Sequence, residues 1–195
     1  KGKLVNASKF GNTILRAARR LTKDVQKNEP DIVVLEFGGN DCNFNWEEVA
    51  ENPYKDHQPA TDFALFQKNL KNTIEYLSTN HVIPVLMTIP PIDADRYFKW
   101  ISKNDPGTAE KILVWLDSVS KIYWWQERYN SAILTIARET KTRLIDIRSA
   151  FLKKPDYRLF YCKDGIHPNA QGQKLIADKI IEYISNGYSF LLKDP

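Results

Sequence analysis

The chain has 195 residues, of which 43% are hydrophobic and 27% are charged. This length and composition fit one globular domain over residues 1–195 and exclude a disordered or fibrous chain. The formal net charge is +4, and Asp24 accompanies the basic cluster from Arg16 to Lys23, which favours a solvated helix face over a nucleic-acid site. No stretch reads as a membrane span or a signal peptide, which leaves the compartment open and slightly favours the cytoplasm.

Short runs of β-branched residues alternate with segments of helical periodicity along the chain. The expected strands or extended pieces cover residues 3–6, 31–37, 82–89 and 143–147. The expected helices cover residues 14–27, 62–79, 109–140 with an interruption near 118–122, and a final stretch around 174–184. Loops are expected from residue 38 to about residue 59 and from 92 to 110. This alternation predicts an α/β fold with a parallel sheet, which binds ligands at the carboxyl ends of its strands.

An aspartate–histidine pair stands out near the C-terminus, where Asp164 precedes His167 by three residues and Pro168 follows at once. A proline pushes the residue before it out of the helical region, so His167 is expected on a loop just ahead of the final helix. Asp164 is then close enough to hold the imidazole Nδ1 and leave Nε2 free to accept a proton, as in a catalytic triad. An ordinary turn with a surface histidine explains this motif alone equally well.

Two glycine-containing segments are expected at the same edge of the sheet. Gly38 and Gly39 directly follow a predicted strand and precede Asn40, while Gly11 lies in a loop that leads into a helix. Glycine lets the backbone approach a ligand closely, and an asparagine amide can donate to a developing oxyanion. Taken alone, the segment 38–41 is more simply explained as a tight turn.

Together these segments resemble the SGNH (GDSL-type) hydrolase superfamily over most of the chain. Residues 6–13 look like the second sequence block of that family, whose glycine, here Gly11, gives a backbone N–H to the oxyanion hole. Residues 38–41 match the third block, whose asparagine, here Asn40, is the side-chain oxyanion donor. Residues 164–168 match the fifth block, which carries the triad residues corresponding to Asp164 and His167.

The first block of that family, an apolar strand ending in Gly-Asp-Ser, is absent from the chain. By the resemblance, the nucleophilic serine is expected upstream of Lys1. Ser8 follows only a two-residue apolar run and Ser189 has no strand before it, so neither is favoured as the nucleophile. No Gly-x-Ser-x-Gly elbow occurs, which argues against an ordinary α/β-hydrolase.

The absent block has a structural implication. The resemblance implies a three-layer, flavodoxin-like α/β/α sandwich with strand order 2-1-3-4-5, in which the first strand is central. Without it, a slot is expected between residues 3–6 and 31–37, with unpaired strand edges on both sides. We therefore expect the natural protein to be longer, or an N-terminal fragment to supply the missing strand.

The implied function is a serine ester hydrolase that acts through an acyl-enzyme and needs neither a metal nor a cofactor. An acetylated carbohydrate is the first expected substrate and a short-chain lipid or aryl ester the second, because four of the five tryptophans lie between residues 100 and 125. These aromatic residues are equally well explained as packing for a long helix. The alternative function is a non-catalytic relative that binds carbohydrate or serves as a scaffold.

Two cysteines flank the proposed site. Cys42 follows Asn40 by two residues and Cys162 precedes Asp164 by two, so the two are expected to approach each other near the active edge. Two cysteines make neither a disulfide framework nor a zinc site. A disulfide between them is disfavoured, because free cysteine is a common buried residue.

Overall fold

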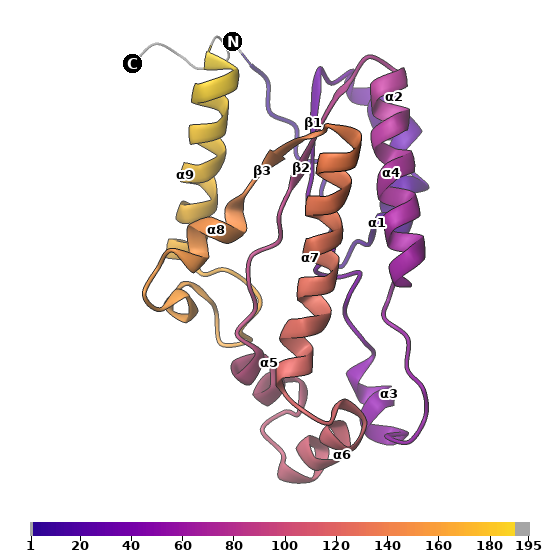
Figure 1. The fold of residues 1–195 in the computed structure, drawn as a ribbon, viewed down its shortest axis with the longest axis vertical. Coiled ribbons are helices and arrows are strands. Elements are labelled where there is room, and N and C mark those ends of the chain that lie inside the picture. Colours follow the sequence, from indigo (N-terminus) through magenta and orange to yellow (C-terminus); the bar gives the residue numbers. More distant parts are fainter. Residues whose placement is uncertain (1, 190–195) are drawn as a thin grey trace.

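The computed structural model describes residues 2–189 and contains a small parallel sheet covered by helices (Figure 1). In this part of the chain the sheet has three strands in the order β1-β2-β3, and each neighbouring pair is parallel. The strands are β1 (Ile32–Leu35), β2 (Ile83–Met87) and β3 (Arg143–Ile145). All three lie within runs predicted as strands, so the predicted α/β class with a parallel sheet is confirmed.

Helices connect the strands and account for most of the described chain. Their bounds are α1 (Ile14–Ala18), α2 (Leu21–Asn28), α3 (Trp46–Glu51), α4 (Phe63–Thr79), α5 (Ala94–Ile101), α6 (Pro106–Leu116), α7 (Ser120–Thr140), α8 (Ile147–Leu152) and α9 (Ala170–Gly187), with a 3-10 turn η1 (Tyr157–Phe160). Capping side chains fix the start of four helices. The first turns of α4, α5, α6 and α9 donate backbone hydrogen bonds to the side chains of Asp62, Asp93, Asp105 and Asn169, respectively. These four helices therefore begin directly after a short polar side chain.

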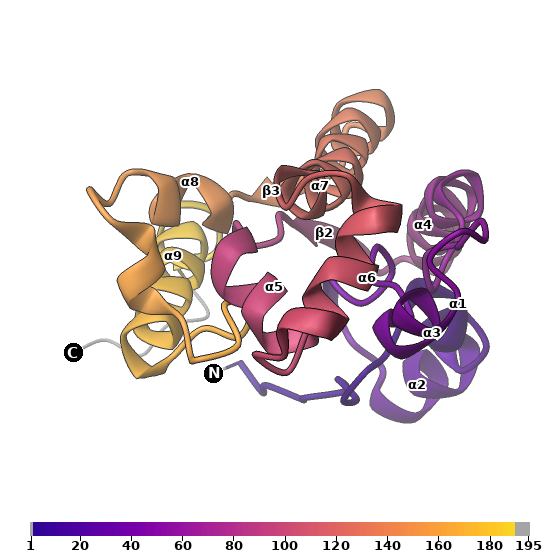
Figure 2. The same ribbon diagram turned by 90° about the horizontal axis from the view of Figure 1, so that it is seen from below.

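The two faces of the sheet have separate cores. Leu35 and Leu86 pack with α4 and α7 on one face, whereas Val85 and Ile145 pack with α9 on the other. A third cluster joins α3, α5 and α6, which Figures 1 and 2 show gathered at one end of the molecule, beyond the sheet. Since the strands run toward this end, the loops that follow them meet there.

Three sequence-based expectations are wrong. Residues 3–6 form no strand, because no neighbouring strand supplies hydrogen bonds to them, and Leu4 is 97% exposed. The segment 14–27 is two helices, since Arg20 N donates to Ala17 O only three residues back, which ends the α-helical pattern. Neither expected loop is free of helix: the stretch 92–110 contains α5 and the start of α6, and the loop expected up to residue 59 contains α3.

The expected slot is present only as one open edge. β1 is one of the two outer strands of the described sheet and pairs with β2 alone, so its other edge has no strand partner within residues 2–189. Val34 on β1 is 46% exposed and Ile83 on β2 is 40% exposed. An unpaired edge beside exposed branched side chains is a template for a further strand.

Candidate active site

The Asp164–His167 turn is built by the carboxylate itself. Asp164 Oδ1 accepts hydrogen bonds from the backbone N–H groups of Ile166 and His167, both at 3.0 Å, and Oδ2 lies 2.7 Å from His167 Nδ1. The predicted contact between Asp164 and Nδ1 is therefore present. The imidazole is 61% exposed, and Nε2 makes no hydrogen bond within residues 2–189, so it is accessible to a reacting group.

The turn also sets the charge state of Asp164. Burial alone would raise the pKa of this carboxyl, but hydrogen bonds from the backbone and ring of His167 and from Ile166 outweigh burial, and the pKa is lowered. The carboxylate is therefore ionised at neutral pH and can orient the imidazole and stabilise the imidazolium that forms on proton transfer.

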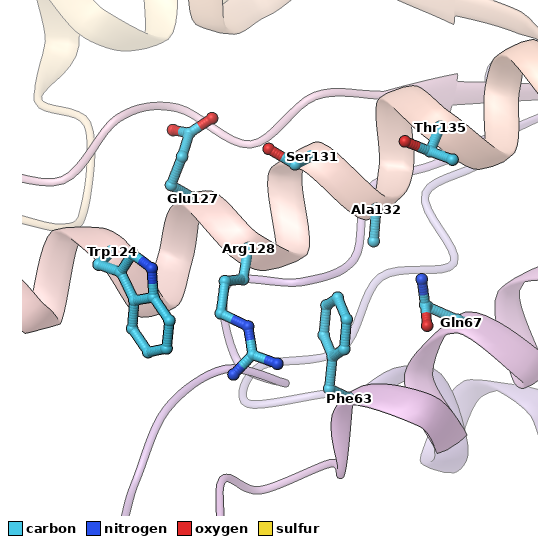
Figure 3. A pocket seen from close by; sticks show the side chains of 8 residues that line it. All are labelled: Phe63, Gln67, Trp124, Glu127, Arg128, Ser131, Ala132 and Thr135. Carbon is cyan, nitrogen blue, oxygen red and sulfur yellow. The ribbon is translucent and has the colours of Figure 1, made fainter.

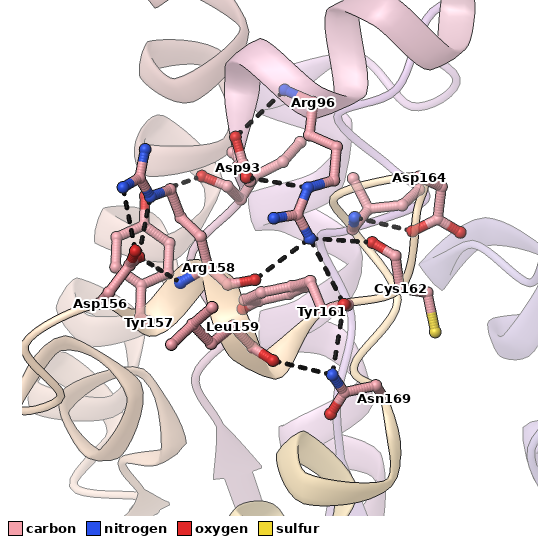
Figure 4. Close-up of polar contacts among 12 residues, drawn as sticks. Asp93, Arg96, Asp156, Tyr157, Arg158, Leu159, Tyr161, Cys162, Asp164 and Asn169 are labelled. Carbon is pink, nitrogen blue, oxygen red and sulfur yellow. Dashed lines mark hydrogen bonds and ion pairs between the residues drawn. The ribbon is translucent and has the colours of Figure 1, made fainter.

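Arg96 on α5 holds the loop that carries this pair (Figure 4). Its Nη1 donates to the backbone carbonyls of Arg158, Tyr161 and Cys162 at 3.1, 3.4 and 3.1 Å. Its Nε lies 3.3 Å from Asp93 Oδ2, so the guanidinium is itself held from the start of α5. The loop is thus fastened by contacts that span more than sixty residues of sequence.

Asn169 holds the other side of the same loop. Its Nδ2 donates to the carbonyls of Leu159 and Tyr161 at 2.9 and 3.3 Å, while its Oδ1 caps the first turn of α9. Cys162 N also donates to His167 O at 2.8 Å and closes the loop at its base. The position of His167 is therefore fixed relative to both α5 and α9.

A buried carboxylate organises the glycine-containing turn at the end of β1. Asp41 is fully buried and accepts hydrogen bonds from Ile14 N at 2.9 Å, Thr61 Oγ1 at 2.7 Å and Gly38 N at 3.0 Å. Burial nevertheless leaves its pKa raised. These contacts tie the turn to the start of α1, the segment that Gly11 leads into.

The two proposed oxyanion donors lie on segments in direct contact. Asn40 Nδ2 donates to Asn12 O at 3.1 Å, which joins the turn after β1 to the residue that follows Gly11. Gly11 has a φ of +64°, a left-handed conformation that favours glycine. The structure thus brings Gly11 and Asn40 into one region of the surface.

Tyr97 connects this region with the histidine loop. Its Oη donates to Asn43 Oδ1 at 2.8 Å, close to the turn after β1, and accepts from Trp46 Nε1 at 3.1 Å. Its backbone N lies 2.9 Å from where a Cβ on Gly165 would be. Sequence reasoning did not identify Arg96, and it noted Tyr97 only as one of the aromatic residues near the expected site, not as a link between loops. The only available signal was Asp93, a helix-capping residue just before both.

Neither candidate serine within the chain contacts His167. Ser8 is exposed and its backbone N donates to Asn6 Oδ1, and Ser189 is also exposed. Among the described residues no group of three metal-ligating side chains lies together, and no helix is long and apolar enough to cross a membrane.

The two cysteines are free. Cys42 is buried and its Sγ contacts Gly39 O at 3.4 Å, whereas Cys162 is exposed. Burial raises the pKa of the Cys42 thiol to about 12. No disulfide joins them, as the sequence indicated.

Most of the aromatic residues form packing rather than an open wall. Phe44 contacts the rings of Trp46, Trp115 and Trp125, with centroids 4.9 to 5.5 Å apart. Trp100 and Trp124 differ from these, since they are 56% and 51% exposed. The packing interpretation therefore holds for Trp46, Trp115 and Trp125.

The parallel sheet, the helices that cover it and the loops gathered beyond its carboxyl ends define an α/β protein. Residues 1–175 match the GDSL-like lipase/acylhydrolase family, and the chain belongs to it. It is 24% identical over 160 residues to GDSL esterase/lipase CPRD49 of Arabidopsis thaliana, and 19% identical over 158 residues to GDSL esterase/lipase WDL1 of Oryza sativa subsp. japonica. These alignments cover 80% of this chain but 55% and 54% of the relatives, so the chain spans about half their length.

Solved structures share the fold. The lipase/acylhydrolase from Enterococcus faecalis superposes with a TM-score of 0.64 at 21% identity, covering 90% of this chain and 72% of that one. A catalytic mutant of Axe2, an acetylxylan esterase from Geobacillus stearothermophilus, gives a TM-score of 0.63 at 20% identity, with 94% and 72% covered.

Proposed function

We propose that the protein is a serine ester hydrolase in which His167 is the general base of a triad and Asp164 is the carboxylate that orients it. The observation that carries this proposal is the 2.7 Å contact between Asp164 Oδ2 and His167 Nδ1, on an imidazole that is 61% exposed and whose Nε2 makes no hydrogen bond in the described chain. In this arrangement Nε2 accepts the proton of a serine as it attacks an ester carbonyl, then gives that proton to the leaving alcohol. Water releases the acyl group by the reverse sequence.

The oxyanion of the tetrahedral intermediate would be stabilised by the Gly11 N–H, the Asn40 side chain and the N–H of the nucleophile. The contact of Asn40 with Asn12 supports this pairing of donors, because it places the two segments together. We place the nucleophile on a strand that pairs with the open edge of β1, outside residues 1–195. Acetylated carbohydrate is the proposed substrate class, in keeping with the acetylxylan esterase named among the structures of similar fold.

The test uses the natural full-length protein, p-nitrophenyl acetate and a fluorophosphonate label, with the labelled residue mapped by mass spectrometry. We expect one labelled serine upstream of Lys1. In the His167→Ala protein we expect labelling to be lost and kcat to fall by about four or more orders of magnitude. Asn40→Ala is expected to lower kcat by roughly 10²–10³. His81→Asn, a change at a histidine that follows α4, is the control and should leave kcat unchanged.

Wild-type turnover in the His167→Ala protein would refute the proposed role of this residue. If the full-length protein neither hydrolyses the ester nor reacts with the label, the alternative of a non-catalytic carbohydrate-binding or scaffold protein is favoured. If the protein is active, its rates of hydrolysis of xylose peracetate and p-nitrophenyl butyrate separate the two substrate classes. We expect the sugar ester to be hydrolysed faster.

A further inference from the structure

A groove lies between α4 and α7, on the side of the sheet opposite α9 and apart from the histidine loop. It has a volume of about 360 Å³, within the range of small-ligand sites. Its lining consists of side chains spaced three or four residues apart on the two helices: Phe63 and Gln67 on α4, and Trp124, Glu127, Arg128, Ser131, Ala132 and Thr135 on α7. This spacing places each set along one helix face, so two side-chain rows border one groove.

Arg128 is the distinctive residue of this groove. Its guanidinium carbon lies 4.5 Å from the ring centroid of Phe63, 4.9 Å from that of Trp124 and 4.7 Å from that of Trp125. Figure 3 shows the group between the Phe63 and Trp124 rings. Three rings around one planar cation restrict its rotation and cover its faces, which leaves the in-plane N–H groups as its open direction.

The N–H donors of this guanidinium have no acceptor within residues 2–189, either as a hydrogen bond or as an ion pair. Two acidic residues that adjoin groove residues in the sequence or line the groove are engaged elsewhere. Glu127, which also lines the groove, pairs with Arg148, and the Asp62 carboxylate accepts the N–H groups of Ala64 and Leu65. Arg128 is therefore a fixed, partly desolvated cation without a counter-ion in the described chain.

The remaining polar groups of the groove suit a hydroxylated ligand. Gln67, Ser131 and Thr135 make no side-chain hydrogen bond within residues 2–189, and all three line the groove. Trp124 keeps half of its surface exposed, which leaves apolar area for a ring. One cation matches a monoanionic carboxylate, which a guanidinium binds through two parallel N–H bonds, better than a dianionic phosphate.

We propose that the groove between α4 and α7 binds a carboxylate-bearing sugar, with the carboxylate on Arg128 and the hydroxyl groups on Gln67, Ser131 and Thr135. This site shares no residue with the Asp164–His167 turn or with the segments of Gly11 and Asn40. It does not depend on the proposed esterase activity, because binding alone defines it.

The test is a titration of the 15N-labelled protein with glucuronate, glucose, acetate and inorganic phosphate at one ionic strength. The probes are the Nε–H of Arg128 and the indole N–H of Trp124, the latter assigned with Trp124→Phe. We expect saturable shifts of these resonances with glucuronate, none with glucose, and at least about tenfold weaker binding of acetate, which lacks the hydroxyl groups. Phosphate is expected to bind more weakly than glucuronate.

The matched variants are Arg128→Gln and Arg138→Gln, both changes on α7, with Arg138 exposed and outside the groove. We expect at least about tenfold weaker glucuronate binding in the first and none of this loss in the second. Ser131→Ala leaves the ring contacts of Arg128 intact and should weaken glucuronate binding by about two- to tenfold. This variant tests the site even if the Arg128→Gln protein does not fold. Absence of saturable binding, unchanged binding in Arg128→Gln, or tighter binding of phosphate would overturn the proposal.

Discussion

Gly165 O accepts a 2.9 Å hydrogen bond from Asp93 N, which places the loop of His167 directly on the start of α5. The approach is so close that a Cβ on Gly165 would lie 2.8 Å from Asp93 O and 2.9 Å from Tyr97 N, both backbone atoms. Gly165 also has a φ of +77°, which L side chains rarely adopt.

Gly165→Ala is therefore expected to destabilise the protein by about 2–4 kcal/mol, through left-handed strain and overpacking together. Urea unfolding followed by circular dichroism measures this change. Gly187→Ala, at the last residue of α9 where a Cβ meets nothing within 4 Å, is the control and should cost nothing. Equal stability of the two variants would contradict the close approach.

The lowered pKa of Asp164 predicts a pH dependence of stability. A carboxyl whose pKa is lower in the folded state stabilises fully above its unfolded-state value, ordinarily 3.8, and this stabilisation is lost as the pH falls through the folded-state pKa. The difference in unfolding free energy between wild type and Asp164→Asn should thus be constant from pH 7 to 5 and shrink toward pH 3. Urea titrations at each pH measure it, and a difference that grows on acidification would mean that the pKa is raised.

Arg96→Gln should loosen the histidine loop while leaving the sheet intact. Hydrogen bonds from a charged donor to three carbonyls are lost, so we expect amide exchange at Cys162 and Gly165 to become at least about tenfold faster. Arg158→Gln is the matched control, because that side chain is half exposed and pairs only with Asp156 among the described residues. Native-state hydrogen exchange by NMR distinguishes the two, and equal protection in both variants would refute a positioning role for Arg96.

The two cysteines should differ in reactivity. At pH 8 a thiol reagent is expected to modify exposed Cys162 in the native protein, while Cys42 reacts only after unfolding, because it is buried and its pKa is raised to about 12. Mass spectrometry of the peptides after iodoacetamide treatment gives the result. The folded Cys162→Ser protein should not be labelled. Rapid labelling of Cys42 in this variant would show that the turn after β1 opens readily.

The parts of the structure that depend on local sequence could be predicted. Parallel strands covered on both faces read as continuous apolar runs, so β1, β2 and β3 all lie inside expected segments, and Pro84 is the second residue of β2, near its start as expected. The Asp164–Nδ1 contact spans three residues and follows from the turn that the motif itself makes. The interruption between α6 and α7 was also expected.

The parts of the structure that depend on contacts between residues far apart in the sequence could not be predicted. Helix α5 was missed because its apolar residues face α3 and α6 rather than the sheet. Arg96 and Tyr97 reach segments more than fifty residues away, and no local pattern marks those partners. The strand expected over residues 3–6 failed for a related reason, since a strand exists only with a hydrogen-bonding neighbour.

The two halves of the candidate site also differ in sequence separation, which bears on when each can form during folding. The Asp164–His167 turn closes over three residues, and short loops of about ten residues close within roughly 10–100 ns. The contacts of Asn40 with Asn12 and of Asp41 with Ile14 span 28 and 27 residues and enclose β1, so they form only as the sheet assembles. The histidine turn can therefore reach its native geometry in a chain that is still largely open, whereas the Gly11–Asn40 region marks completion of the tertiary fold.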